Sequence, residues 1–224
     1  MKTKKSLFLW PILFIFLTTY YADSSKKINT KFFTVENIQI KGVIYTDFNK
    51  IKNNFDIFKG NNIIFINNEK IKRVISDFEF IKEIKLKKIY PNSIIINILE
   101  YEPLGILYKE ETKFILTEKK ILIKWRDLES LGDIPLVYGL NAENFFYDFY
   151  KNIKNIYPNM HEIKQLNYYK INRWDIILKN DKVIKLPSKN YEKSLQKFLQ
   201  INEKEEFSKF KVFDFRVKDQ LILK

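Results

Sequence analysis

Tyr90-Pro91-Asn92-Ser93 is followed by an apolar stretch over residues 94–100, and Pro103 ends this stretch. Proline and asparagine favour turns, so the tetrapeptide predicts a tight connection between two strands. The strand before it is indicated by Ile84 and Leu86, which alternate with lysines as a half-buried strand requires. The sequence therefore predicts a hairpin with its turn at 90–93.

One strand and two helices are predicted ahead of this hairpin. The strand runs from Val35 to Lys41, and Gly42 breaks it. The first helix begins after Asp47, whose side chain suits the N-cap position. Both helices place apolar residues three and four positions apart: Phe48, Ile51, Phe55 and Phe58 in the first, and Ile71, Val74, Ile75 and Phe78 in the second. The predicted order is strand, helix, helix, strand, strand.

This order resembles a POTRA domain, together with the Tyr90-Pro91-Asn92 turn and the strand that ends Glu100-Tyr101-Glu102-Pro103. The resemblance covers about residues 33–105. POTRA domains occur in outer-membrane assembly proteins, in two-partner secretion pores and in cell-division proteins of the FtsQ/DivIB family. A pore would continue into a long transmembrane β-barrel, and the roughly 120 residues that remain are too few for its repeated hairpins.

The remaining residues predict a mixed domain of short strands and two amphipathic helices. The helices carry Phe145, Phe146, Phe149, Ile153 and Ile156 in the first, and Tyr191, Leu195, Phe198 and Leu199 in the second. The predicted strands are Ile106–Tyr108, Phe114–Thr117, Ile121–Trp125, Pro135–Tyr138, Ile163–Tyr169, Trp174–Leu178, Val183–Leu186, Lys211–Val217 and Leu221–Lys224.

Three stretches of this second part resemble the β-domain of the FtsQ/DivIB family. They are Leu131–Gly139, Trp174–Leu178 with the Asn180-Asp181 that follows it, and Phe213-Asp214-Phe215-Arg216-Val217. The expected fold class is α+β. It comprises a single N-terminal transmembrane helix, a POTRA domain of β-α-α-β-β order, and a mixed α+β domain whose β-sheet ends in an edge strand.

The first residues carry a membrane signal. Lys2, Lys4 and Lys5 precede an apolar run from Leu7 to Ala22, the arrangement that the secretion machinery recognises. Cleavage after Ala22 would require a small residue where Tyr20 stands, so an uncleaved anchor is favoured over a cleaved signal. The expected division is a cytoplasmic tail at 1–5, a transmembrane anchor at 6–22, a linker at 23–32, a POTRA domain at 33–104 and a β-domain at 105–224. The lysines keep the tail cytoplasmic and leave the folded part outside the inner membrane.

The composition argues against catalysis. The 224 residues include no Cys and one His, which excludes a disulfide framework, a zinc-thiolate site and a thiol nucleophile. His161 suits a capping or surface role, and the five glycines form no phosphate-binding loop, so we predict no enzyme activity, no metal and no cofactor. The net charge of +13 comes mainly from lysine, since only four of the 40 basic residues are Arg. Solvated surfaces or an anionic membrane explain this charge better than nucleic acid does.

The resemblance implies a divisome scaffold that binds FtsB and FtsL outside the cytoplasm, at the septum. A final strand at a sheet edge suits this role, because its unpaired backbone groups can accept a partner strand. We expect Phe215 and Val217 on one face and Asp214, Arg216 and Lys218 on the other. The candidate partner-binding residues are Asp214, Phe215, Arg216, Val217, Lys218, Leu221, Ile222 and Leu223, with Lys193 on the last helix.

Simpler roles stay open for these residues. Phe213, Phe215 and Val217 also suit core packing, Asp214 and Arg216 also suit a structural ion pair, and Lys193 also suits a solvated surface. Three rival functions stay open for the whole chain. They are a POTRA module that assists protein transport or outer-membrane assembly, an envelope enzyme that acts on glycan, and a nucleic-acid binder, which export would exclude.

Overall fold

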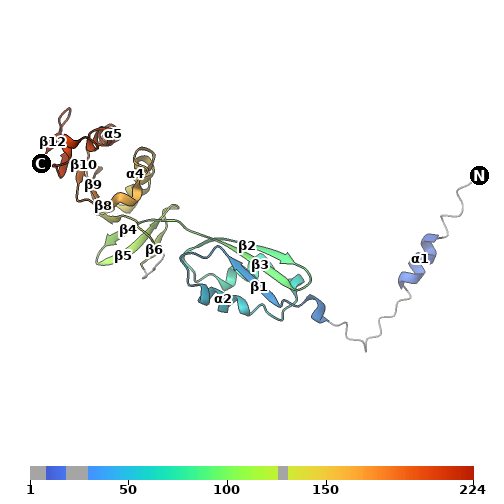
Figure 1. Cartoon of the computed structure of the whole chain (residues 1–224). Coiled ribbons are helices and arrows are strands. Elements are labelled where there is room, and N and C mark those ends of the chain that lie inside the picture. Colours follow the sequence, from blue (N-terminus) through green and yellow to red (C-terminus); the bar gives the residue numbers. More distant parts are fainter. Residues whose placement is uncertain (1–8, 19–29, 126–130) are drawn as a thin grey trace, which may run out of the picture.

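The computed structural model describes residues 9–18, 30–125 and 131–224 (Figure 1). Helix α1 spans Leu9–Thr18, ten residues of high hydrophobicity. Among the described residues, no helix has both the length and the apolar character needed to cross a bilayer. The expected tail at 1–5 lies outside the described residues, as do most of the expected linker and both ends of the expected anchor.

The N-terminal domain has the β-α-α-β-β order that the sequence predicts. Its three-stranded sheet has the order β1-β3-β2, with β1 parallel to β3 and β2 antiparallel to β3. Helices α2 and α3 supply apolar side chains to one core on this sheet. The elements are η1 (Thr30–Phe33), β1 (Asn37–Lys41), α2 (Phe48–Asp56), η2 (Ile63–Phe65), α3 (Asn68–Val74), β2 (Ile81–Ile89) and β3 (Ser93–Glu100).

Local sequence signals explain where α2 begins and what it buries. The Asp47 carboxylate accepts hydrogen bonds from the backbone N–H groups of Asn49 and Lys50, at 2.9 and 3.2 Å, so the predicted N-cap is confirmed. Ile51 and Phe55, four positions apart, are fully buried against the sheet. Gly42 ends β1 with a φ of +85°, and a Cβ there would lie 2.1 Å from the Ile98 carbonyl oxygen, so only glycine fits.

Glu100, at the end of β3, is a buried carboxylate with a structural task. Its two oxygens accept hydrogen bonds from the backbone N–H groups of Ile44, Tyr45 and Thr46, at 2.6, 2.7 and 2.9 Å. The side chain therefore holds the loop between β1 and α2 against the end of the sheet. Glu100 begins the Glu100-Tyr101-Glu102-Pro103 stretch, so this sequence feature includes the residue that holds the loop.

The C-terminal domain is built on one nine-stranded sheet of the order β12-β11-β10-β9-β8-β7-β4-β5-β6. Helices α4 and α5 pack against each other and share one large core with the sheet. The elements are β4 (Pro103–Lys109), β5 (Thr112–Thr117), β6 (Leu122–Lys124), β7 (Leu136–Tyr138), α4 (Glu143–Ile156), η3 (Met160–Glu162), β8 (Ile163–Tyr169), β9 (Arg173–Leu178), β10 (Val183–Lys185), α5 (Tyr191–Asn202), η4 (Glu205–Phe207), β11 (Val212–Asp214) and β12 (Ile222–Leu223).

Among the strand boundaries that differ from the sequence-based expectation, two concern the domain boundary and the candidate residues. Pro103 opens β4 instead of merely ending β3, so the expected domain boundary between 104 and 105 falls inside β4. Proline is tolerated there because it occupies the first position of the strand. Strand β11 ends at Asp214, three residues before the predicted end at Val217. The chain turns away at that point, because Arg216 folds back onto Asp214.

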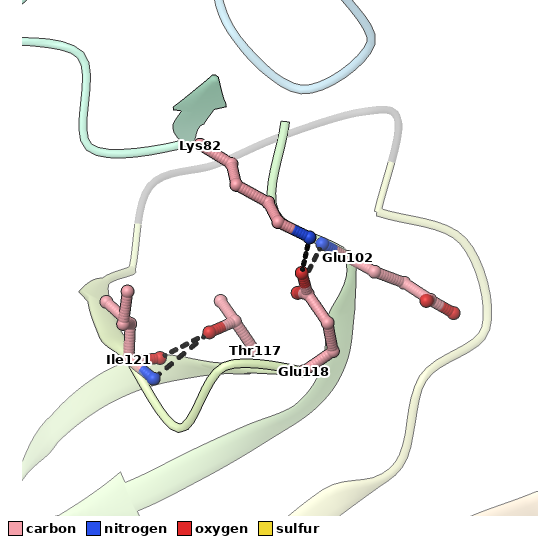
Figure 2. A network of polar contacts seen from close by, with 5 residues as sticks. All are labelled: Lys82, Glu102, Thr117, Glu118 and Ile121. Carbon is pink, nitrogen blue, oxygen red and sulfur yellow. Dashed lines mark hydrogen bonds and ion pairs between the residues drawn. The ribbon is translucent and has the colours of Figure 1, made fainter. Parts of the chain in front are cut away.

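The two domains meet at a small joint. Its apolar part buries Phe80 of the N-terminal domain with Ile115 and Ile123 of strands β5 and β6. Figure 2 shows its polar part, in which the Glu118 carboxylate accepts hydrogen bonds from Lys82 Nζ at 2.9 Å and from the Glu102 backbone N–H at 2.8 Å. One side chain from the C-terminal domain therefore binds both the linking segment and β2 of the N-terminal domain.

Replacing Glu118 with Ala is expected to weaken this joint. The Glu102 N–H and Lys82 both lose their acceptor, and the bond from the Glu102 N–H to the charged carboxylate is the larger loss. Replacing Lys82 with Met should have a smaller effect, because Lys82 is at the surface, where solvent competes for the ion pair. Urea unfolding of the two variants measures this order. A larger loss for Lys82→Met would contradict it.

Candidate functional site

Strand β12 forms one edge of the nine-stranded sheet. It pairs antiparallel with β11, placing Ile222 opposite Asp214 and Leu223 opposite Phe213. The Lys224 N–H donates to the Val212 carbonyl at 3.1 Å, and the Val212 N–H donates to the Lys224 carbonyl at 3.0 Å. The predicted edge position of the last strand is confirmed.

This pairing fixes which backbone groups face away from the sheet. In an antiparallel ladder, residues alternate between pairs that exchange two hydrogen bonds and pairs that exchange none. Because Lys224 and Val212 exchange both bonds, the N–H and C=O of Leu223 point to the open side of β12. The edge therefore offers a donor and an acceptor to an additional strand.

A groove with a volume of about 500 Å³ lies beside this edge, between the start of α5 and the segment after β11. One wall comprises residues 187–190 and the first turns of α5, and the other comprises residues 215–220. The charges in it are strongly unequal, since its lining holds one acidic side chain, Asp219. The basic side chains of the lining are Lys189, Lys193, Lys197, Arg216 and Lys218. Such a groove favours a negatively charged ligand segment.

A row of charges crosses the sheet next to the groove. The strand register places Lys185 of β10 directly opposite both Asp175 of β9 and Asp214 of β11. Side chains directly opposite each other share one face of the sheet. Burial raises the pKa of Asp175, while the nearby Arg173 guanidinium, 3.6 Å from it, opposes this shift.

Asp214 and Arg216 form a two-pronged ion pair at the end of this row. Arg216 Nε donates to Asp214 Oδ1 at 2.8 Å, and Nη2 donates to Oδ2 at 2.5 Å. The Arg216 backbone N–H also donates to Oδ1, at 3.1 Å. These bonds lower the pKa of Asp214 below its ordinary value. Asp214 is buried whereas Arg216 remains exposed at the groove, so the pair anchors a positive charge there.

Comparison with known proteins matches both domains to models of one protein family. The model of the FtsQ-type POTRA domain matches residues 33–101, and the model of the FtsQ/DivIB C-terminal domain matches residues 108–216. The chain belongs to the FtsQ/DivIB family of cell-division proteins. Strand β12 lies beyond both matched segments, so the edge is a feature that the structure adds.

Curated relatives in the family carry the same names. Cell division protein FtsQ of Rickettsia felis is 24% identical over 226 residues, which cover 97% of this chain and 84% of that one. Cell division protein DivIB of Clostridium botulinum is 31% identical over 147 residues, 66% of this chain and 55% of that one. Among solved structures, the major extracytoplasmic domain of DivIB from Geobacillus stearothermophilus, as its trans isomer, is 14% identical. It covers 46% of this chain and 92% of that one with a TM-score of 0.35, too low to establish a shared fold.

The structure brings part of the candidate set of this FtsQ/DivIB chain together. Lys193 lies across the groove from four of the other candidates, although about 20 residues separate them in sequence: Phe215, Arg216, Val217 and Lys218. The terminal candidates Leu221, Ile222 and Leu223 lie on or next to the edge strand instead. The candidate set therefore divides between a groove and an edge.

Two expectations about side-chain orientation were wrong. Phe215 and Val217 do not share a strand face, because the strand ends at Asp214, and Phe215 is buried while Val217 is 45% exposed. Asp214 does not share a strand face with Arg216 and Lys218, because β11 ends at Asp214. Arg216 already has a partner in Asp214, which the simpler ion-pair interpretation had anticipated.

Sequence reasoning missed Lys189 and Lys197 as members of the groove. Lys197 lies four positions after Lys193, so both project from one face of α5. That spacing was a usable signal, whereas Lys189 became visible only when the fold placed the segment before α5 at the groove. Among the described residues, no group of three or more acidic or histidine side chains is arranged to hold a metal ion.

The Asp214 pair predicts a pH dependence of stability. Because the folded-state pKa of Asp214 is lowered, its stabilising contribution is complete above the ordinary aspartate pKa of about 4. That contribution disappears as the pH falls through the lower folded value. Asp214→Asn should therefore reduce the free energy of unfolding at pH 7 and match the unchanged chain in strong acid.

Urea unfolding across this pH range measures the effect. Asp219→Asn is the matched control, since Asp219 is exposed and has a φ of +60°, a conformation that Asn also adopts readily. If Asp214→Asn and Asp219→Asn changed stability equally at pH 7, the pair would have no structural role.

Proposed function

We propose that this FtsQ/DivIB chain is a non-enzymatic divisome scaffold that binds FtsB and FtsL outside the cytoplasm. The N-terminal apolar segment anchors it in the inner membrane, and the folded domains lie on the outer side, at the septum. By holding these partners the chain helps to control septal peptidoglycan synthesis. The observation that supports this proposal best is the open edge of β12 beside a strongly basic groove.

The mechanism is strand addition followed by charge selection. A partner segment pairs with β12 through main-chain hydrogen bonds, beginning with the N–H and C=O of Leu223. Acidic side chains that flank the segment then reach the groove and meet Lys193, Lys197 and Arg216. Backbone pairing supplies affinity without regard to sequence, whereas the groove selects the partner. Anchoring of all partners in one membrane raises their local concentration and compensates for a modest interface.

A titration of the purified chain with the extracytoplasmic segment of FtsB from the same organism tests the proposal. The chain should bind, and the double variant Lys193→Glu/Lys197→Glu should bind about tenfold more weakly, a difference of about 1.4 kcal/mol. The matched control is Lys119→Glu/Lys170→Glu, which changes the net charge equally at two exposed lysines in the β5–β6 and β8–β9 turns. If the control weakened binding equally, the loss of affinity would come from net charge and not from the groove. Absence of binding by the unchanged chain would refute the proposal.

A further inference from the structure

An exposed apolar cluster occupies one end of the N-terminal domain. Its six side chains are between 37% and 69% exposed, although all are large and apolar or aromatic. We call this cluster the aromatic tip; it comprises Phe32, Phe33, Ile64, Phe65, Ile89 and Tyr90. Single exposed apolar residues are ordinary, but a cluster of them marks a contact surface.

Several contacts hold the aromatic tip together. The rings of Phe32 and Phe33 pack edge to face at 5.4 Å, and those of Phe33 and Tyr90 at 6.3 Å. Lys88 Nζ donates a hydrogen bond to the Ile64 carbonyl at 2.8 Å, which ties η2 to the end of β2. Three segments that are distant in sequence, namely η1, η2 and the β2–β3 turn, therefore form one surface.

The aromatic tip lies at the end of the domain opposite to the joint. The register pairs Asn37 with Ser93, so β1 begins at the same end as the β2–β3 turn. Strand β3 then runs to Glu100 and into the joint at the other end. In Figure 1 the C-terminal domain accordingly continues from the end of the sheet that is remote from η1.

The chemistry of the aromatic tip suits a lipid surface. The Tyr90 phenol ring favours the interface between hydrocarbon and head groups, and phenylalanine side chains enter the boundary between head groups and acyl chains. The neighbouring lysines Lys87 and Lys88 favour anionic head groups. Of the nearby acidic side chains, Asp56 pairs with Lys59 at 2.8 Å, whereas Glu36 accepts a hydrogen bond from the neutral Asn92 Nδ2 at 2.7 Å and keeps its charge.

The length of chain between α1 and η1 limits how far the aromatic tip can lie from a membrane that holds α1. The described side chains of α1, over residues 10–18, are all exposed and mostly apolar. Eleven residues separate α1 from η1, a distance of at most about 40 Å when fully extended. A bilayer that holds α1 therefore lies within this distance of η1, on the side where the chain enters the domain.

We propose that the aromatic tip rests on the outer surface of the membrane that holds α1, with its rings at the level of the lipid head groups. This inference depends on the anchoring that belongs to the proposed function. Two attachments, α1 and the aromatic tip, hold the N-terminal domain in one orientation. The joint then directs the C-terminal domain, with its groove and β12, away from the lipid.

A site-specific fluorescent label tests this contact in the full-length chain. The sequence has no Cys, so Lys87→Cys introduces one labelling site next to the aromatic tip; it removes one neighbouring lysine and none of the apolar side chains. The chain is reconstituted into vesicles of equal parts phosphatidylcholine and phosphatidylglycerol, with and without a lipid that carries a quenching nitroxide. A second labelled variant, Leu13→Cys, reports whether α1 is in the bilayer.

Quenching of the label at 87 by the nitroxide lipid is expected, and Phe32→Ser/Phe65→Ser should reduce it severalfold. Ile171→Ser, which removes an equally exposed apolar side chain in the C-terminal domain, should leave it unchanged. Quenching at 13 but none at 87 would overturn the contact and leave anchoring intact, whereas quenching at neither would overturn both. If the fluorescence of the label at 87 changed with the protein-to-lipid ratio and not with the quenching lipid, the surface would contact a second copy of the chain. That result would overturn the lipid contact.

Discussion

Replacing Leu223 with Pro is expected to abolish most of the binding of FtsB while leaving the chain folded. Proline removes the one N–H of β12 that points away from β11, and its ring occupies the space of an incoming strand. The existing ladder keeps its Lys224–Val212 bonds, since proline is tolerated on an edge where its missing N–H faces solvent. The expected loss of affinity is at least tenfold, or about 1.4 kcal/mol, in the titration described above.

Leu223→Val is the matched control for this variant. It keeps the N–H and a similar side chain, so it should bind nearly as well as the unchanged chain. A chain that ends at Lys218 lacks β12 altogether and should show no binding, provided that circular dichroism confirms its fold. Normal binding by Leu223→Pro and by the truncated chain would move the interface away from β12.

Replacing Phe213 with Ala is expected to cost about 3–5 kcal/mol of unfolding free energy, the range for a large aromatic side chain lost from a core. Phe213 is completely buried, and its ring packs edge to face on Phe198 of α5 at 4.9 Å. It also lies opposite Leu223 in the strand register, so the two side chains share one face of the sheet. Urea unfolding measures the loss.

Val217→Ala provides the comparison from the same sequence motif. Val217 is 45% exposed at the groove, and its truncation should change stability by less than about 0.5 kcal/mol. Phe213 therefore acts as scaffold, whereas Val217 is available to a partner. Similar stability losses for both variants would contradict this division.

Periodic patterns and caps made much of the fold predictable. Apolar residues at helical spacing located α2, α4 and α5, and Asp47 marked where α2 begins. These features depend on residues that are close in sequence, so a single sequence contains them.

The orientation of the candidate side chains was less predictable, because it depends on where β11 stops. A run of alternating residues from Phe213 to Val217 reads as one strand, yet the bond from Arg216 to Asp214 ends it early. The groove likewise depends on contact between α5 and the segment after β11, which are joined only by folding. The pairing of charges across β9, β10 and β11 is equally a property of register and not of local sequence.

Hydrogen exchange at the backbone amide of Leu223, with and without the FtsB segment, tests whether the partner adds a strand to β12. In the free chain this N–H points away from β11 and should exchange rapidly, whereas the inward N–H of Lys224 is bonded to Val212. The partner should slow exchange at Leu223, because the added strand accepts the hydrogen bond of this N–H. Saturating binding with no protection at Leu223 would contradict strand addition at β12.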